Sequence, residues 1–451
     1  MMDRREFLAR ISAPAFLGVA SGLTLPAEVP KADVTLRISP VELEIAARKT
    51  IKTTGYNGMA PGPVLRMPEG KPVTIDVYNE TKIPELVHWH GLFSPSEVDG
   101  SVEEGTPLIP PQGFERYSFV PRPSGTRWYH THIHAGRDLK RSTYTGQFGF
   151  FYLEPRHDPG NYDAEVFLAL HGWDGYLSAG ALEEDSLEVA YNWFSVNGRA
   201  LGHGEPIRVR ERQKVLFHIL NANATLEHRI ALTGHRFNVV SLDGNPVPVP
   251  REVEALDLGV AERVDAVVTM DQPGVWILGE IDDHMRRSGL GIVVEYANRS
   301  DSPRWNPPAS AAWDYTIFGR EGGTPGPEVE VIPLVFRSKF AGHNWVDYWT
   351  INGKSYPETG PIPVRAGQRY RLVFDNQSDD AHPVHLHRHS FELTKFAGKP
   401  TAGVVKDTVM VPARRQVEVD LLADNPGPTL FHCHNQLHMD YGFMTLLQYT
   451  G

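Results

Sequence analysis

Residues 382–398 read HPVHLHRHSFELTKFAG, and residues 228–244 read HRIALTGHRFNVVSLDG. The two stretches align without a gap at an offset of 154 residues. At the same offset, LFHCHNQLHM (430–439) falls on WILGEIDDHM (276–285). Repetition at a long fixed period indicates a chain that contains several copies of one structural unit. We therefore expect the middle and last thirds of the chain to share one fold.

The repeated unit has the pattern of short β-strands. Apolar and polar residues alternate in runs such as PVTIDVYN (72–79) and YRLVFDN (370–376), and turn residues separate the runs. An N-terminal copy is marked by related stretches, GKPVTIDVYN (70–79), VHWHG (87–91) and WYHTH (128–132). We predict an all-β chain of three consecutive Greek-key β-sandwich domains. The predicted domains are residues 30–157, 158–302 and 303–451.

The N-terminus has the pattern of an export signal. Paired Arg4 and Arg5 precede an apolar run over residues 11–27 that is too short and too interrupted for a confident membrane span. We interpret residues 1–29 as a twin-arginine signal peptide and spacer, which predicts a periplasmic or extracellular protein without membrane attachment after cleavage. The alternative is an N-terminal anchor. The formal net charge of −11 argues against a nucleic-acid-binding protein.

Histidines occur in pairs separated by one residue, in the first and third copies. The pairs are His88 and His90, His130 and His132, His385 and His387, and His432 and His434. The middle copy has Ala231-Leu-Thr233 and Leu278-Gly-Glu280 at the equivalent places. Since the middle copy does without these histidines, they are additional to what the fold requires.

The spacing of these residues predicts two linked metal sites. On a strand, residues two apart point to one face, so each pair turns both imidazoles the same way. The only cysteine, Cys433, lies between His432 and His434 and therefore points to the opposite face. With His382 and His438 it offers two imidazoles and a thiolate, the ligands of a blue-copper centre. The backbone through Cys433 then connects this site to the histidine cluster.

These motifs resemble those of the three-domain, laccase-like multicopper oxidases. The resemblance rests on VHWHG, WYHTH, HPVHLH (382–387) and HCHNQLH (432–438), and it spans the mature chain. It implies cupredoxin-like domains and four coppers per chain: one type 1, one type 2 and two type 3. The implied type 1 ligands are His382, Cys433 and His438, and the implied type 2 ligands are His88 and His385. The implied type 3 ligands are His90, His130, His132, His387, His432 and His434.

The resemblance also suggests residues around the coppers. The type 1 axial position falls on Phe443, which cannot ligate; Met444 is next, but strand alternation turns it to the other face. O2 reduction consumes protons, and Asp99 matches the family's acid near type 2 copper, although it also suits a turn before Gly100. The family often has an acid directly after the second type 1 histidine. Here that residue is Met439, so Asp440 is the candidate substitute.

Several other residues allow two interpretations. Asp407 matches a family pattern but also suits a structural role. His134 and His389 are either donors that orient ligands or partly buried bystanders. In the middle copy, His228 and His284 coincide with the type 1 histidines, but Gly279 replaces the cysteine, which favours a vestige over a working site.

We therefore interpret the chain as an exported, laccase-like multicopper oxidase. Its expected partners are O2 and a small aromatic reductant such as a phenol, and a monomer is expected. One alternative is a cuprous oxidase in copper tolerance; against it stand only nine methionines and no methionine-rich insert to bind Cu(I). A second alternative is a non-enzymatic periplasmic scaffold on the same fold, which the full ligand set argues against.

Overall fold

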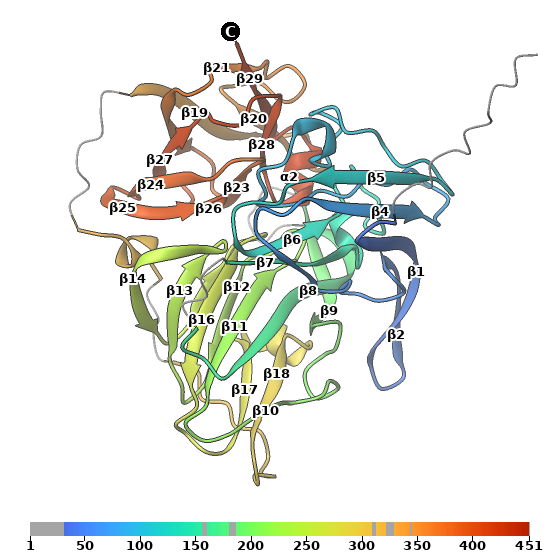
Figure 1. Cartoon of the computed structure of the whole chain (residues 1–451), viewed down its shortest axis with the longest axis vertical. Helices are drawn as coiled ribbons and strands as arrows, with labels where there is room; N and C mark the ends of the chain where they lie inside the picture. Colours follow the sequence, from blue (N-terminus) through green and yellow to red (C-terminus); the bar gives the residue numbers. More distant parts are fainter. Residues whose placement is uncertain are drawn as a thin grey trace, which may run out of the picture. The chain divides into compact units, whose positions relative to one another are not determined.

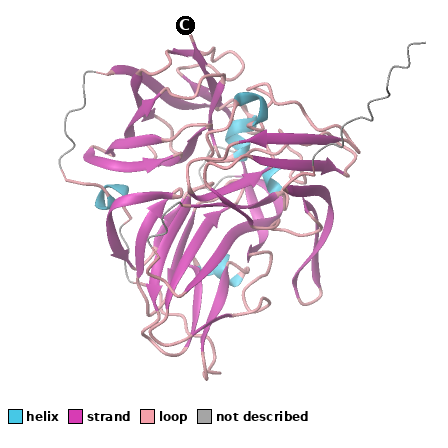
Figure 2. Cartoon of the chain, in the orientation of Figure 1, coloured by secondary structure: helices cyan, strands magenta, loops and turns pink. Residues whose placement is uncertain are grey.

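The computed structural model describes residues 31–155, 160–179, 186–308, 313–321, 329–342 and 345–450. Almost all regular structure in these residues is β-strand, with a few short helices (Figures 1 and 2). This confirms the predicted all-β fold class. The proposed signal segment 1–29 and the predicted boundary between residues 157 and 158 lie outside the described residues.

The strands form six sheets that fall into three consecutive pairs along the chain. The first pair contains β1 (Val34–Ala46), β2 (Lys49–Tyr56), β4 (Val73–Asn79) and β5 (Phe114–Phe119) in one sheet, and β3 (Leu65–Pro68), β6 (Gly125–His130) and β7 (Phe148–Glu154) in the other. The second pair contains β8 (Ala164–Ala179), β9 (Leu187–Val196), β11 (Lys214–Asn221), β13 (Phe237–Leu242), β14 (Asn245–Val253) and β16 (Arg263–Thr269), facing β10 (Ile207–Val209), β12 (His228–Leu232), β15 (Leu256–Leu258), β17 (Val275–Glu280) and β18 (Gly291–Tyr296). The third pair contains β19 (Glu330–Lys339), β20 (Tyr348–Ile351), β22 (Arg369–Asn376), β24 (Phe391–Phe396), β25 (Lys399–Lys406) and β27 (Gln416–Leu422), facing β21 (Ile362–Val364), β23 (His382–Leu386), β26 (Thr408–Val411), β28 (Thr429–Cys433) and β29 (Met444–Tyr449).

The second and third sheet pairs have the same topology. The larger sheet of the second pair runs β14-β13-β16-β11-β8-β9, and that of the third runs β25-β24-β27-β22-β19-β20. The smaller sheets correspond in the same way, β10-β18-β17-β12-β15 and β21-β29-β28-β23-β26. The neighbours are not consecutive along the chain, as a Greek-key connection requires. The sequence repeat therefore marks a repeated fold, although the exact domain boundaries stay a prediction.

One buried asparagine ends the equivalent strand in each sheet pair. Asn79 ends β4, Asn221 ends β11 and Asn376 ends β22. Each side-chain amide donates to one carbonyl of the following connection and to another at least 30 positions away, for example from Asn376 Nδ2 to the carbonyl oxygens of Asp380 (2.7 Å) and Val411 (3.2 Å). Each amide therefore ties the connection to a more distant part of its sheet pair. The bond network fixes the connection that leads to the next strand, and in the third pair that strand begins with His382.

Helices among the described residues are short. They are α1 (Asp283–Arg287), α2 (Gln436–Asp440), and the 3₁₀ turns η1 (Ser96–Val98), η2 (Ser142–Tyr144) and η3 (Tyr315–Phe318). Asn435 caps α2 by accepting the backbone N–H groups of Leu437 (3.0 Å) and His438 (3.4 Å). None of the described helices has the length and apolar character that a membrane-spanning segment needs.

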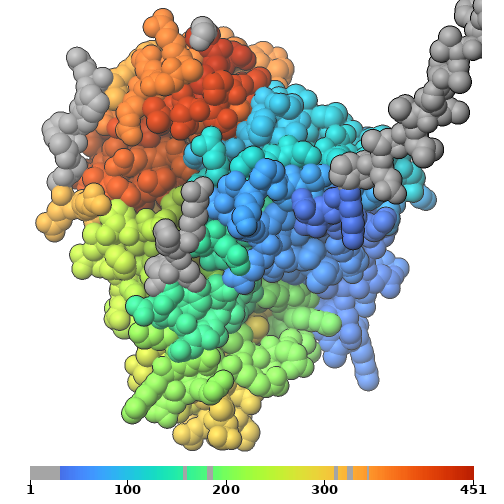
Figure 3. Space-filling model, viewed as in Figure 1, coloured from blue at the N-terminus to red at the C-terminus, as the bar shows by residue number. Residues whose placement is uncertain are grey.

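The first and third sheet pairs lie against each other (Figure 3), and buried polar contacts join them. The Arg388 guanidinium is 1% exposed and donates from Nε to the carbonyl oxygen of Ser94 (2.9 Å). Asn425 donates to the same carbonyl from Nδ2 (3.1 Å). Since this contact joins residues more than 290 positions apart, it brings the histidine pairs of the first and third copies to one place.

Candidate metal centres

His382, Cys433 and His438 form a compact triad of possible ligands. His382 begins β23, Cys433 ends β28 and His438 lies on α2. The Cys433 sulfur lies 3.8 Å from His382 Nδ1 and 3.6 Å from His438 Nδ1, and the two nitrogens are 3.2 Å apart. The centre of such a triangle is roughly 2 Å from each corner, close to ordinary metal–imidazole bond lengths. We call these residues the thiolate triad.

Aromatic side chains pack against the histidines of the thiolate triad. The ring centroid of Trp349 lies 4.1 Å from that of His438 and 4.7 Å from that of His382. Phe443 is fully buried, and its ring centroid lies 4.8 Å from that of His382. Met444 begins β29 and packs instead with Leu430 and Met439 in a separate apolar cluster. The structure thus places Phe443, and not Met444, beside the triad.

The eight paired histidines come together as one buried group, which we call the histidine cluster. Their ring nitrogens form three sets in which all ligand atoms lie within 4.8 Å, and the first two share His90: His88, His90 and His385; His90, His130 and His434; and His132, His387 and His432. The sequence predicted that both members of each pair lie on one strand, but the structure differs from this. His130 ends β6, while β23 ends between His385 and His387 and β28 ends between His432 and His434. His88 makes only an isolated bridge, to His130.

The hydrogen bonds of the histidine cluster leave free lone pairs facing its centre. His387 Nδ1 donates to the Asp99 carboxylate (2.8 Å), and His432 Nδ1 donates to the carbonyl oxygen of Cys433 (2.9 Å). The Nε2 atoms of these two rings, both acceptors, lie only 3.1 Å apart. Five further ring nitrogens are buried without a hydrogen-bond partner: Nε2 of His88, His130, His385 and His434, and Nδ1 of His90. Converging unprotonated nitrogens are what a bound cation would pair, so the residues fit a multinuclear metal site.

Burial keeps these imidazoles neutral. Burial and neighbouring histidines hold the pKa of His90, His130, His132, His385, His432 and His434 well below its ordinary value. Burial lowers the pKa of His438 to about 3, and it raises the pKa of the Cys433 thiol. Neutral imidazole is the form that binds metals, whereas the thiol requires a metal to hold it as thiolate.

Asp407 orients two cluster histidines and is itself clamped by arginines. Its Oδ1 accepts from His90 Nε2 (3.1 Å), and its carbonyl oxygen accepts from His385 Nδ1 (2.8 Å). Arg263 donates twice to this carboxylate (2.8 and 2.5 Å) and Arg127 once (3.4 Å), and all three side chains are fully buried. Burial raises the pKa of Asp407, but the two guanidiniums outweigh it and the pKa is lowered. Asp407 therefore stays ionised and fixes the ring orientation.

Asp99, the acid that the family resemblance suggests, contacts two cluster histidines. Its Oδ2 is 3.0 Å from His88 Nδ1 and 2.8 Å from His387 Nδ1, and the Ser94 hydroxyl donates to Oδ1. Glu104, which the sequence did not reveal, has Oε2 3.3 Å from His387 Nδ1 and accepts the Leu430 N–H at Oε1 (2.7 Å). Burial and the neighbouring Asp99 raise the pKa of Glu104. The cluster thus has two buried carboxyl groups beside it.

Within the described part of the chain, Asp440 contacts none of the cluster histidines. The last residue of α2, it accepts the N–H groups of Ala135 (3.0 Å) and Gly136 (2.8 Å) and lies 3.1 Å from His134 Nδ1. The carboxylates of Asp440 and Glu103 raise the pKa of His134 to about 10. The Asp440 contacts join the loop after His132 to the helix that carries His438. Elsewhere, His389 Nδ1 bonds the carbonyl oxygen of His387 (3.1 Å).

The middle copy contains no equivalent triad among its described residues. His228 is bonded at both nitrogens, to Glu280 Oε2 (3.2 Å) and to Asn223 Nδ2 (3.3 Å). His284 is exposed on α1. A side chain at Gly279 would meet the Leu290 carbonyl at 2.9 Å, so a cysteine does not fit there without adjustment. This arrangement matches the expected vestige.

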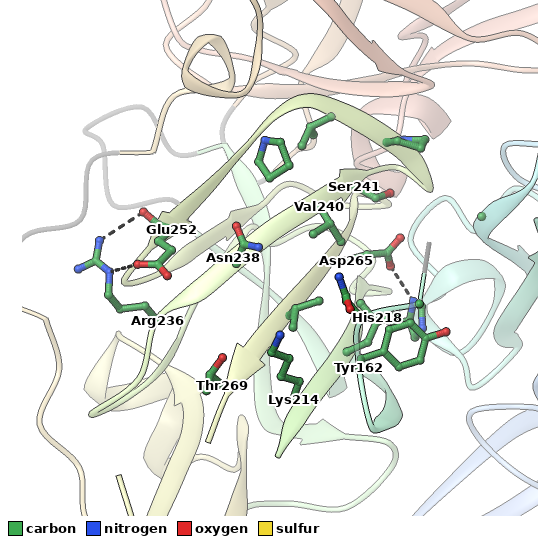
Figure 4. A pocket seen from close by; sticks show the side chains of 18 of the residues that line it. Tyr162, Lys214, His218, Arg236, Asn238, Val240, Ser241, Glu252, Asp265 and Thr269 are labelled. Carbon is green, nitrogen blue, oxygen red and sulfur yellow. Dashed lines mark hydrogen bonds and ion pairs between the residues drawn. The ribbon is translucent and has the colours of Figure 1, made fainter. Parts of the chain in front are cut away.

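Two cavities differ in their relation to these centres. A pocket of about 210 Å³ opens beside His438 and is lined by Glu188, Glu227, Asp380 and Met410. A larger cavity of about 970 Å³ lies over β11, β13, β14 and β16 of the second sheet pair, and it includes His218 and Asp265 (Figure 4). The larger cavity has none of the predicted ligands in its lining, so the smaller pocket is the one that belongs to the thiolate triad.

Comparison with known proteins gives consistent findings. Models of the multicopper oxidase family match residues 37–158, 128–285 and 333–450. The chain is 31% identical to multicopper oxidase MmcO of Mycobacterium tuberculosis (92% of this chain, 86% of that protein) and 27% identical to bilirubin oxidase of Albifimbria verrucaria (88% and 72%). The crystal structure of Fet3p, a multicopper oxidase that functions in iron import, superposes with a TM-score of 0.79 at 18% identity (92% and 90% covered).

Proposed function

Because the chain belongs to the multicopper oxidase family, an oxidoreductase family that uses O2, we propose that it is a laccase-type enzyme with four coppers. Bound copper would supply one-electron oxidation of a small aromatic reductant at the thiolate triad and reduction of O2 to water at the histidine cluster. The observation that carries the proposal is Cys433: its sulfur lies in the triad, and both of its sequence neighbours lie in the cluster.

The grouping of ring nitrogens supports an assignment of ligands to coppers. His382, Cys433 and His438 would hold type 1 copper, and His88 and His385 would hold type 2. One type 3 copper would take His90, His130 and His434, and the other would take His132, His387 and His432. Phe443, beside His382, would leave type 1 copper without a strong axial ligand.

The surrounding residues hold ligands and carry protons. Asp407 fixes His90 and His385, and the Arg263 clamp keeps it ionised. Asp99 and Glu104 are the acids placed to supply protons where O2 is reduced, since both reach His387. Asp440 lies farther out, paired with His134, and would act as a link toward solvent rather than as the last donor.

The pocket beside His438 supports a second candidate reductant, Cu(I). Glu188, Glu227 and Asp380 line it, and none of their carboxylates makes a hydrogen bond or ion pair within the described residues. Met410 adds a thioether, a soft ligand for Cu(I). An acidic pocket attracts cations, so a cuprous oxidase stays a candidate beside the phenol oxidase.

We further propose export by the twin-arginine route and a monomeric enzyme in the periplasm or outside the cell.

Oxygen consumption by the copper-loaded protein tests the proposal and separates the two reductants. Uptake with a phenol supports the laccase assignment, and uptake with Cu(I) alone supports the cuprous oxidase. Cys433→Ser removes the thiolate and should abolish both activities while the fold persists, because the middle copy folds without any cysteine. Unchanged uptake in this variant would refute the proposal.

A further inference from the structure

Asp243 is a hairpin-turn aspartate that lies fully buried. With Gly244 it forms the two-residue turn between β13 and β14, and both residues have positive φ, 47° and 70°, as such a turn requires. Turns normally lie on the protein surface, but Asp243 is 0% exposed. A side chain at Gly125 of β6 would overlap the Gly244 carbonyl, so the turn packs directly against the backbone of the first sheet pair.

The third copy shows that this turn does not need an acid. At the offset of 154 residues, Asp243 and Gly244 correspond to Ala397 and Gly398, the turn between β24 and β25. That turn also has positive φ at both residues, 46° and 88°, and Gly398 is exposed. The Asp243 carboxylate is therefore additional to what the fold requires, as the paired histidines are.

The Asp243 carboxylate binds three consecutive residues of the third sheet pair. Its Oδ2 lies 2.9 Å from Lys406 Nζ and accepts the N–H groups of Asp407 (3.3 Å) and Thr408 (3.2 Å). Here the chain passes from β25 in one sheet to β26 in the other. On the opposite side, Oδ1 accepts the N–H of Arg263 (3.0 Å). All four partners are donors, so an amide in place of the carboxylate would turn its own N–H groups toward donors.

The same segment, residues 406–408, orients two rings of the histidine cluster. The carbonyl oxygen of Asp407 accepts from His385 Nδ1 (2.8 Å), and its Oδ1 accepts from His90 Nε2 (3.1 Å). The Thr408 hydroxyl lies 3.2 Å from each of these two nitrogens. The rings of His90 and His385 are stacked, with centroids 3.7 Å apart. Since Asp243 fixes the backbone of Asp407 and Thr408, it acts on both rings through this segment.

We propose that Asp243 is a positioning residue for the histidine cluster. The second sheet pair holds none of the candidate ligands among its described residues. Through this one carboxylate it sets the place of residues 406–408, and thereby the rings of His90 and His385, the proposed ligands of one type 3 copper and of type 2 copper. Loss of the groups that orient ligand rings weakens metal binding by roughly 10–100-fold. This inference rests on the proposed function.

A comparison of copper-loaded Asp243→Asn with Glu262→Gln tests the positioning role. Glu262 lies in the same buried network: its Oε1 is 3.1 Å from Lys406 Nζ and accepts from the Tyr315 hydroxyl (2.6 Å). Within the described residues, its side chain makes no hydrogen bond to the backbone of residues 406–408. Both variants therefore remove a buried carboxylate beside Lys406, but only D243N removes the one that holds the segment in place.

The electron paramagnetic resonance spectrum of type 2 copper reports the geometry of its ligands. It should shift in D243N and match the wild type in E262Q. A competing chelator should remove copper from the histidine cluster roughly tenfold more readily in D243N alone. The blue band of the thiolate triad should stay in both variants, because its ligands lie outside this network.

A pair of double variants makes the same comparison if D243N does not fold. Lys406→Met is combined with D243N in one protein and with E262Q in the other. Each double variant removes one acid and one base, so no buried charge is left without a partner. The spectrum of type 2 copper should shift only in D243N/K406M.

The outcomes separate this inference from the proposed function. A type 2 spectrum and a copper affinity in D243N equal to those of the wild type would overturn the role of Asp243, even with O2 consumption intact. An equal change in E262Q would also overturn it, because a general weakening of the buried network would then explain both variants. A wild-type protein that binds no copper at the histidine cluster would instead overturn the proposed function, and this inference with it.

Discussion

Asp407→Asn is the substitution whose effect the structure predicts most sharply. The side chain keeps its size but loses the charge that neutralises Arg263 and Arg127, both fully buried. Removing one partner of a buried ion pair costs about 3–5 kcal/mol. We expect the lower end, since Arg127 also donates to Asn245 Oδ1 (2.9 Å) and Arg263 to the carbonyl of Ala261 (3.0 Å). A loss of about 3 kcal/mol should lower the melting temperature of the metal-free protein by roughly 5–10 °C.

The matched control for this variant is Asp420→Asn. Asp420 also binds an arginine in two places, at 2.7 and 3.0 Å from Arg371, but that arginine side chain is 28% exposed. Partly exposed pairs contribute at most about 1 kcal/mol. Thermal and denaturant unfolding of both variants, without copper, measure the difference. If D407N and D420N lose the same stability, the buried clamp does not hold the structure as described. With copper, D407N should also bind the metal roughly 10–100-fold more weakly, because His90 Nε2 then donates to a neutral amide oxygen instead of a carboxylate.

Three further predictions follow from single residues or from the metal. Phe443→Met should shift the visible spectrum and lower the potential of type 1 copper, because it adds a thioether beside His382. Met444→Leu should change neither property, since Met444 packs in a separate apolar cluster. The reverse pattern would make Met444 the axial residue. Burial lowers the pKa of His218, but Asp265 and Glu165 outweigh it and raise the pKa to about 9. The contribution of His218 to the stability of the fold is therefore complete below about pH 6.5 and is lost as pH rises through 9. The free energy of unfolding should fall by roughly 3 kcal/mol over that range in the wild type and change less in His218→Asn. Removing copper with a chelator should lower the melting temperature but retain the β-sheet circular dichroism spectrum, and global unfolding on chelation would contradict the independence of fold and metal.

Much of the fold was predictable because the sequence repeats. The stretches beginning at His228 and His382 became equivalent strands, β12 and β23, in sheets of identical topology. The repeat also identified the paired histidines as additional to the fold, and the structure gathers all eight. The detailed placement of the pairs was wrong, since three pairs straddle the end of a strand and the fourth, His88 and His90, lies outside the named strands. In the three pairs at strand ends, the second imidazole is free of the strand ladder.

Residues around the ligands were harder to predict, because their partners are distant in sequence. Glu104 reaches His387 across 283 positions, and no spacing in VEEGTP (102–107) indicates it. The Arg263 partner of Asp407 lies in another sheet pair, 144 residues away. Asp440 was predicted because it lies two residues after His438, yet its side chain contacts His134 and Gly136 in the loop after His132. Such contacts depend on how the sheet pairs meet, which local patterns do not encode.

The central claim is that Cys433 links a thiolate copper centre to the histidine cluster. The most direct measurement is the visible spectrum and copper content of the copper-loaded protein, beside those of Cys433→Ser. We expect about four coppers per chain and an intense blue Cu(II)–thiolate band in the wild type, and about three coppers with no such band in the folded variant. A blue band that survives in C433S, or a folded wild-type protein that takes up no copper, would contradict it.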